Sequence, residues 1–395
     1  MPPDFTQDKN LKVALVHDYL REYGGAERVV EDLHEIFPEA PLFTSYYNPS
    51  GLGGNAGRFK SWDIRTSWMQ HVPFANRLIS PFRIFAPLMF QSFNFTGYDM
   101  VISSDAIYFP KSINVPKNTL HICYIHTPPR YLYGYATSYN YKKHWWTRVG
   151  GEIMNHFLRI WDFQFAQKPD ILVANSKNIQ ARIKKFYRRD STVIYPGTDV
   201  EKCKVQSATL RLHSGQESKV RNYYLCLGRL VRSKGVEVAI EACNKLKLPL
   251  KVAGSGPMLP ELKKMAGPTV QVLGGVTDEE RVELLTNAKA LLLLEEEPDF
   301  GITSVEAQAC GTPVIALKVG GYLETVVEGK TGMFFRGNGG QVTADSLIGA
   351  LQNFNNLNYW SGEAVRQACL KNAQKFSKER FKKEILELVE RNLKK

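Results

Sequence analysis

Residues 290–317 limit the fold of this chain more than any other stretch. An apolar run, 290–294, leads into EPDFGITSVEAQACGTP (297–313), and a second apolar run, 314–317, follows. This order predicts a strand, a loop, a helix, a tight turn and another strand. A helix that connects two buried strands makes them parallel, and parallel sheets occur in α/β proteins with helices on both faces.

The same alternation continues along the chain and divides into two sets of six strands. A length of 395 residues also favours two domains over one. In the first half we expect strands at 13–17, 41–45, 100–103, 121–125, 171–174 and 192–195. In the second half we expect them at 223–227, 250–253, 270–273, 290–294, 314–316 and 332–335. Each set fits a doubly wound, Rossmann-like parallel sheet, whose ligands bind outside the carboxyl ends of the strands.

Changes in pattern give the expected domain boundaries. A first domain, 1–198, precedes a polar stretch without clear periodicity, 199–221, which we expect to be a linker. A second domain covers 222–375, and 376–395 reads as an amphipathic terminal helix. Two facing domains would place a ligand in the cleft between them.

The charge balance narrows the possible partners. The net charge is +12, from 23 Lys/Arg against 16 Asp/Glu in residues 1–197 and 28 against 23 in the remainder. A basic protein can meet nucleic acid, an anionic membrane or phosphorylated substrates. Nucleic acid is not expected, because the sequence shows no basic helix, aromatic RNA-binding motif or zinc site.

Cysteine usage and the N-terminal sequence favour a cytoplasmic protein. The six cysteines form no CxxC pair, as is typical of reduced thiols. No run approaches the roughly 18 apolar residues that span a bilayer, and MPPDFTQDKN lacks a signal pattern. The sequence shows no Asp-x-Asp and no His cluster of metal-ligand type, so we expect neither a metal nor another cofactor.

Glu306 falls on the first turns of the helix expected within 297–313. Free N–H groups at the start of that helix, around 301–304, attract anions. A carboxylate beside them can accept a pair of hydrogen bonds from a ribose or sugar diol. The alternative is a buried α/β loop with one solvated glutamate.

Two cations are spaced to hold a diphosphate. Arg229 follows the first strand of the second half, and Lys234 comes five residues later, just before a helix. Cations at a strand end and a helix start can clamp a diphosphate from both sides. Two solvated surface cations are the alternative.

The first half has two candidate binding turns. Gly24 and Gly25 lie at a strand-to-helix turn and would let backbone approach a phosphate or sugar. The turn is not GxGxxG, so a nicotinamide cofactor is not indicated. His126 leaves the end of strand 121–125 with Arg130 close behind, and it is suited to proton transfer or to orienting a hydroxyl. A packing turn and a structural histidine are the alternatives.

Together these segments resemble the retaining glycosyltransferases of family 4, which have the GT-B fold of two facing Rossmann-like domains. The stretch 297–316 resembles the donor-sugar signature of that family, and GRLVRSKG (228–235) resembles its diphosphate clamp. HTPPRYLY (126–133) resembles a segment of bacterial O-antigen-type mannosyltransferases within the family. The resemblance covers about residues 12–340, in the family's order.

The resemblance implies roles for individual residues. Catalytic roles go to His126, Arg229, Lys234 and Glu297. Donor-binding roles go to Gly24, Gly25, Gly254, Gly256, Phe300, Gly301, Ile302, Thr303, Glu306, Gly321 and Glu324. Acceptor-binding roles go to Gly25, Glu27, His126 and Arg130. The resemblance also implies that the terminal helix packs back on the first domain.

Pro298 departs from the family pattern. The usual E-x7-E spacing would put an acid there, and Glu297 and Asp299 flank it instead. Proline biases the residue before it towards an extended backbone. We therefore predict that Glu297 contacts the transferred sugar and that Asp299 accepts a hydrogen bond from the loop backbone. A solvated acidic cluster, 295–297, is the alternative.

Aromatic residues mixed with cations in 60–93, and again in YKKHWWTR (141–148), suit an anionic membrane surface. A core helix with solvated arginines is the alternative.

The function that the resemblance implies is metal-independent hexosyl transfer with retention. The subgroup suggests GDP-mannose as donor and a saccharide or lipid-linked acceptor, with an anionic membrane surface as a further partner. A UDP-sugar donor is one alternative. An inactive GT-B module that binds glycans or partners is another, and Pro298 is its main support.

Overall fold

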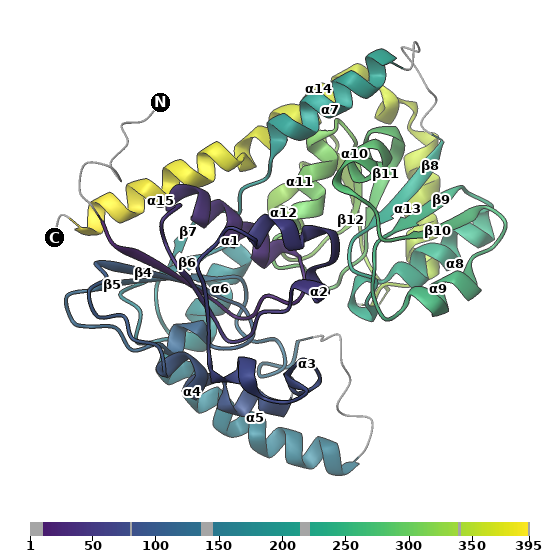
Figure 1. Cartoon of the computed structure of the whole chain (residues 1–395). Coiled ribbons are helices and arrows are strands. Elements are labelled where there is room, and N and C mark those ends of the chain that lie inside the picture. The colour runs from purple at the N-terminus through teal and green to yellow at the C-terminus, as the bar shows by residue number, and fades with distance from the viewer. Residues whose placement is uncertain (1–10, 80, 136–144, 214–221, 339–340, 394–395) are drawn as a thin grey trace. The chain divides into compact units, whose positions relative to one another are not determined.

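The computed structural model describes residues 11–79, 81–135, 145–213, 222–338 and 341–393, which divide between two compact units. Unit 1 comprises Met1–Gly197 and Phe381–Lys395, and unit 2 comprises Thr198–Arg380. Figure 1 shows the elements of both units.

Unit 1 is built on a parallel sheet of seven strands in the order β3-β2-β1-β4-β5-β6-β7. The strands are β1 (Val13–His17), β2 (Leu42–Thr44), β3 (Ile64–Thr66), β4 (Met100–Asp105), β5 (Leu120–Ile125), β6 (Ile171–Ala174) and β7 (Thr192–Val193). The helices are α1 (Gly25–Ile36), α2 (Pro49–Leu52), α3 (Ala75–Leu78), α4 (Ala86–Gln91), α5 (Trp145–Phe165) and α6 (Lys177–Tyr187). Short 3-10 segments lie at Gly53–Phe59, Trp68–His71, Pro81–Phe85 and Pro110–Ser112.

Strand β1 shows why this sheet is buried on both faces. Val13 and Leu15 enter the core on one face, while Ala14 and Val16 enter the core on the other. Alternation with a period of two is what a strand imposes, so continuous apolar runs mark strands with covered faces. Helix α15 (Lys378–Leu393) contributes Phe381, Ile385 and Val389 to the first of these cores.

Unit 2 is built on a parallel sheet of six strands in the order β10-β9-β8-β11-β12-β13. The strands are β8 (Tyr223–Leu227), β9 (Leu250–Ala253), β10 (Val270–Gly274), β11 (Ala288–Leu293), β12 (Val314–Leu317) and β13 (Gly332–Phe335). The helices are α7 (Val200–His213), α8 (Val236–Leu246), α9 (Leu259–Met265), α10 (Asp278–Asn287), α11 (Ile302–Ala309), α12 (Tyr322–Thr325), α13 (Ala344–Asn356) and α14 (Glu363–Ala373). Short 3-10 segments lie at Arg232–Lys234, Asn358–Ser361 and Gln374–Phe376.

The two doubly wound parallel sheets confirm the expected fold class, with two differences in detail. Strand β3 is a seventh strand in unit 1, where we expected six. Residues 200–213, expected to belong to a linker without regular structure, form helix α7, which packs against α10 and α11 within unit 2. The lack of a periodic pattern in 199–221 thus led us to place the start of the second unit at residue 222, whereas it begins at Thr198.

The aromatic stretch 60–93 divides between core and surface. Phe90 is fully buried, and Trp62 and Phe93 pack against cores, so the core alternative holds for these side chains. Trp68, Phe74 and Phe85 are exposed. The side chains of 141–148 lie outside the described residues. Among the helices that the structure describes, none has the length and hydropathy of a membrane-spanning segment.

Candidate functional site

In unit 2 the candidate site lies where the direction of strand addition reverses. The chain adds β9 and β10 on one side of β8, and then adds β11 on the other side. Ligands of open parallel sheets bind at such switch points, outside the carboxyl ends of the strands. A pocket opens there, between the ends of β8 and β11, and its lining includes Arg229, Lys234, Glu295, Thr303 and Tyr322.

One of the two cations of the expected diphosphate clamp pairs with a carboxylate that we did not predict from the sequence. Arg229 is exposed just after β8. Lys234 forms an ion pair with Glu295, in the loop after β11. The Glu295 side chain is only 8% exposed, against 35% for Lys234. Lys234 is therefore held over the pocket by a buried carboxylate, rather than projecting freely from the surface.

Glu306 is also paired within unit 2. Its side chain, on the second turn of α11, is buried and accepts a hydrogen bond from the guanidinium of Arg281 on α10. We had not predicted Arg281, since its spacing from Glu306 carries no recognisable pattern. Because two helices fix this carboxylate, its position is set before any ligand binds.

Tightly packed glycines hold the loops that surround the pocket. A Cβ at Gly321 would lie 2.4 Å from Phe300 Cα, and a Cβ at Gly254 would lie 1.7 Å from Gly228 O. Gly256 likewise approaches the Leu230 carbonyl. Backbone contacts this close exclude any side chain, so these glycines shape the binding loops whether or not they touch a ligand.

The loop around Pro298 is anchored by backbone and side-chain contacts. Pro298 is buried, and its carbonyl accepts a hydrogen bond from Gly321 N at 2.9 Å. Glu296 accepts a hydrogen bond from Val342 N at 3.1 Å. Glu297 and Asp299 are both half-buried. The choice between them as the sugar-contacting carboxylate stays a prediction.

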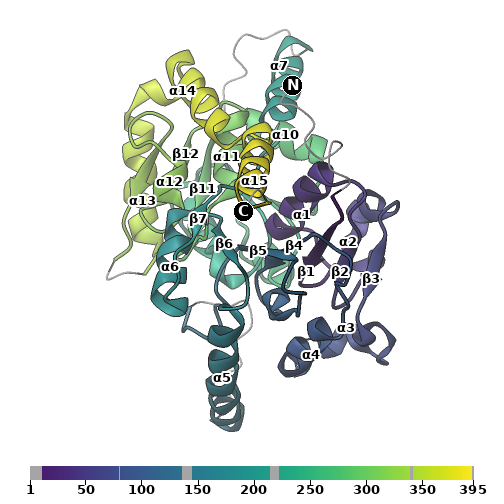
Figure 2. The same cartoon turned by 90° about the vertical axis from the view of Figure 1, so that its left-hand side faces the viewer.

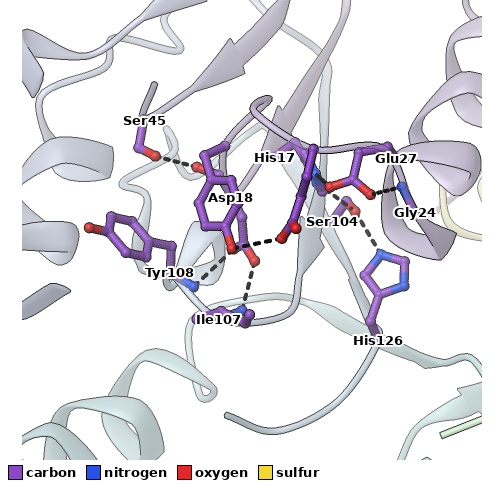
Figure 3. Close-up of polar contacts among 11 residues, drawn as sticks. His17, Asp18, Gly24, Glu27, Ser45, Ser104, Ile107, Tyr108 and His126 are labelled. Atoms are coloured by element: carbon purple, nitrogen blue, oxygen red, sulfur yellow. Dashed lines mark hydrogen bonds and ion pairs between the residues drawn. The ribbon is translucent and has the colours of Figure 1, made fainter. Parts of the chain in front are cut away.

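In unit 1 polar side chains gather at the ends of β1, β4 and β5, again at a switch point, between β1 and β4. Ser104 Oγ lies 3.1 Å from His17 Nδ1 and 2.8 Å from His126 Nε2 (Figure 3). His17 Nε2 lies 3.6 Å from Glu27 Oε1, and Glu27 Oε2 accepts a hydrogen bond from Gly24 N. These contacts form one continuous chain of polar interactions, which runs from Gly24, just before α1, to His126.

The electrostatics of this chain give it a direction. Burial opposes the charge of His17, but hydrogen bonding and attraction to Glu27 outweigh it and raise the His17 pKa. Burial, aided by repulsion from His17, lowers the pKa of His126 to about 3. When His17 is protonated, its Nδ1–H donates to Ser104, and Ser104 then donates to Nε2 of a neutral His126. In this arrangement Nδ1 of His126 carries the proton.

Buried carboxylates lie beside the chain. Asp18 accepts hydrogen bonds from Ile107 N at 2.7 Å and Tyr108 N at 3.0 Å (Figure 3). Burial and repulsion from Asp105 raise the Asp18 pKa to about 7. The fully buried Lys111 lies 2.5 Å from Asp105 Oδ2.

Some of these residues were predicted and others were missed. Gly24, Glu27 and His126 come together in unit 1, and Arg229 and Lys234 come together in unit 2. The missed residues of the unit 1 site are His17, Asp18, Ser104, Asp105 and Lys111. The available signals were HD, which begins with the last residue of the first strand, and SSD at the end of another strand. Within the described residues, no group of three or more His, Cys, Asp or Glu side chains could hold a metal ion.

The remaining predicted residues have simple places in the fold. Gly25 begins α1, and Arg130 begins the turn at 130–134 that comes after β5. Ile302 and Thr303 begin α11, which Gly301 precedes in the left-handed backbone region, and Glu324 lies on α12. Phe300 is buried and packs edge-on against Phe376.

Comparisons with known proteins match both halves of the chain. Residues 23–202 match the family described as Glycosyltransferase Family 4, and residues 212–368 match Glycosyl transferases group 1. A D-inositol 3-phosphate glycosyltransferase from Corynebacterium urealyticum is 30% identical over 48% of this chain and 50% of its own length. The D-rhamnosyltransferase WbpZ of Pseudomonas aeruginosa is 29% identical over 43% of this chain and 47% of its own. The chain spans about half the length of these curated relatives.

Solved structures share the fold over nearly the whole chain. HepE of Anabaena, solved with UDP and glucose, has a TM-score of 0.67 and 16% identity, covering 96% of this chain and 99% of its own. Sucrose-phosphate synthase of Thermosynechococcus elongatus has a TM-score of 0.70 and 18% identity, covering 96% of this chain and 98% of its own. The two units thus share their fold with these proteins, and each half of the chain matches a glycosyltransferase family model.

Proposed function

We propose that this chain, which carries glycosyltransferase domains in both halves, transfers a hexosyl group from a nucleotide sugar to a saccharide or lipid-linked acceptor. The observation that carries the proposal is the pocket between β8 and β11, where Arg229 and Lys234 stand together at the switch point of the sheet. Two cations beside the α11 N-terminus suit a diphosphate better than a neutral ligand.

On the donor side, charge stabilisation is the main chemical contribution. As the bond between sugar and diphosphate breaks, negative charge grows on the departing diphosphate, and Arg229 and Lys234 offset it. These cations supply the charge that a metal ion would otherwise supply, so no metal is required. Glu306, fixed by Arg281, would accept hydrogen bonds from donor hydroxyls.

On the acceptor side, neutral His126 would orient a hydroxyl through its Nδ1–H. Among the residues that the structure describes, no carboxylate has an evident nucleophilic role. We therefore propose front-face attack as the route to the retention that the resemblance implies. In this route the acceptor hydroxyl bonds to the anomeric carbon while its proton passes to the departing phosphate oxygen.

The donor is proposed to be GDP-mannose, on the resemblance of 126–133 to O-antigen-type mannosyltransferases. A UDP-sugar is the second candidate, supported by the fold shared with a protein solved with UDP and glucose. A lipid-linked acceptor would place the enzyme in the cytoplasm, at the inner face of the membrane. An inactive binding module would retain nucleotide-sugar affinity without turnover.

A thermal-shift screen of GDP-, UDP- and ADP-hexoses tests the donor site, because a ligand that binds only the folded state raises the melting temperature. We expect at least one of them to raise it in the wild type and to lose most of that effect in Arg229→Ala. A flat response to all three nucleotides would rule out the donor pocket as assigned.

A further inference from the structure

Helix α5 (Trp145–Phe165) turns an apolar face to solvent. Val149, Ile153 and Phe157 are 52%, 58% and 55% exposed, and Ile160 and Trp161 continue the same line. Steps of four, four and three to four residues put these side chains on one side of a helix. Among the described side chains of α5, 149–165, the exposed ones include no Asp, Glu, Lys or Arg.

The orientation of this face is fixed by the opposite side of the helix. Asn155 and Leu158 are buried there, and Leu158 enters the core shared with α4. Asp162 is fully buried and lies 2.8 Å from Lys111. Turning the stripe inward would bring this buried ion pair and Leu158 to the surface, so they hold the stripe on the outer side of the helix.

Neighbouring segments add further exposed apolar side chains. Phe74, before α3, is 75% exposed, and Leu88, on α4, is 57% exposed. Both segments pack in the same core as α5, and both views show α5 extending beyond the sheet of its unit (Figures 1 and 2). Apolar surface gathered in this way marks an interaction site more often than chance.

The surrounding charge indicates the kind of partner. Residues 64–98 and 106–151, which contain α3, α4 and the start of α5, hold nine Lys or Arg and no Asp or Glu. Lys111 is buried against Asp105 and Asp162, and Arg65 pairs with Asp63, so the excess positive charge of these segments comes from the other seven. A second copy of the chain would bring the same positive segments to the contact and be repelled. A bilayer with anionic headgroups would attract them while accepting the apolar side chains at its acyl boundary.

We infer that the α5 stripe, defined as Val149, Ile153, Phe157, Ile160 and Trp161, docks unit 1 onto an anionic bilayer surface. The helix lies in the interface and does not cross it. The inference deepens the proposed function and rests on it for the reason the enzyme would visit a membrane, namely a lipid-linked acceptor. The docking itself needs no nucleotide sugar.

Vesicle co-sedimentation without any nucleotide sugar tests the inference separately from activity. The probes are phosphatidylcholine vesicles with and without phosphatidylglycerol. We expect the wild type to bind the anionic vesicles at least tenfold more strongly than the neutral ones, and binding to weaken as salt rises, because screening shortens the reach of surface charge. Ile153→Glu with Phe157→Glu should lower the partition coefficient at least tenfold.

Val205→Glu is the matched control, since Val205 is 60% exposed on helix α7 of unit 2. It adds a charge to another apolar surface position and should leave binding within twofold of the wild type. Ile153→Ser with Phe157→Ser adds no charge and should also bind at least tenfold more weakly. The serine variant is used in place of the glutamate double variant if the latter has a lower melting temperature than Val205→Glu.

Three results would overturn the inference. One is wild-type binding to vesicles in both double variants, and another is no binding by the wild type to anionic vesicles. The third is a wild-type protein that does not bind vesicles but forms a dimer in sedimentation velocity, where the serine double variant is a monomer. That result would assign the stripe to a second copy of the chain.

Discussion

Replacing Lys234 by methionine should damage both stability and catalysis, whereas replacing Arg229 should damage catalysis alone. Lys234 is paired with Glu295, whose side chain is 8% exposed. Removing the cation leaves a nearly buried carboxylate without its partner, which costs about 1–3 kcal/mol of unfolding free energy. The cost falls below the roughly 3–5 kcal/mol of a fully buried pair, because solvent reaches the 35% exposed lysine.

Arg229 gives the matched comparison. Its side chain is exposed, so Arg229→Met should change the unfolding free energy by no more than about 0.5 kcal/mol. Both variants should lose about 2–4 kcal/mol of transition-state stabilisation, or roughly 30- to 1000-fold in kcat/KM. Urea denaturation measures the first quantity, and initial rates of hexosyl transfer measure the second.

A rescue variant separates the two effects. Adding Glu295→Gln to Lys234→Met removes the lone buried charge, so it should restore at least half of the lost unfolding free energy without restoring kcat/KM. A Lys234→Met protein as stable as the wild type would refute the role of the Glu295 pair. Wild-type kinetics in both single variants would refute the diphosphate clamp.

Three further predictions concern other buried or half-buried groups. Glu297→Gln should lose about 1.5–3 kcal/mol of transition-state stabilisation in kcat/KM, because a charged hydrogen bond is lost, and Asp299→Asn should be nearly neutral. If only Asp299→Asn lost activity, Asp299 would be the sugar-contacting carboxylate. If neither variant lost activity, neither residue would have that role. Lys111→Met should lower the unfolding free energy by about 3–5 kcal/mol in urea titration, because two buried carboxylates lose their cation; a loss below 1 kcal/mol would contradict this. Burial and nearby cations lower the pKa of His121 to about 3, below its unfolded value, so folded protein resists protonation and stability falls as pH drops from about 6.5 towards 3. His121→Gln should flatten that fall by up to about 1.4 kcal/mol per pH unit, and an unchanged slope would contradict the buried neutral imidazole.

Burial made most of the fold predictable from the sequence. Strands covered on both faces are mostly apolar, so residues 13–16 of β1 and all of β12, Val314–Leu317, appear as continuous apolar runs. Strand β3 has only three residues and lies half-exposed at the sheet edge, which leaves no run to detect. Helix α7 was missed because its apolar residues form no single stripe, and its packing against α10 and α11 supplies what periodicity does not.

The candidate site was only half predictable for a different reason. Arg229 and Lys234 lie close together in sequence, next to strand and helix signals. The residues that pair within each site come from distant segments. In unit 2, Glu295 follows its partner Lys234 by 61 residues, and in unit 1, Ser104 follows its partner His17 by 87. Only the sheet order, which places β11 beside β8 and β4 beside β1, brings such groups together. Spacing along the chain does not contain that information.

Release of nucleoside diphosphate from a radiolabelled nucleotide hexose, with water as the acceptor, tests the central claim most directly because it requires no knowledge of the natural acceptor. The proposed function predicts slow release from at least one of the GDP-, UDP- and ADP-hexoses, and at least 30-fold slower release in Arg229→Met. Donor binding without release in the wild type, even with lipid-linked and saccharide acceptors added, would contradict the proposed transfer and identify an inactive binding module.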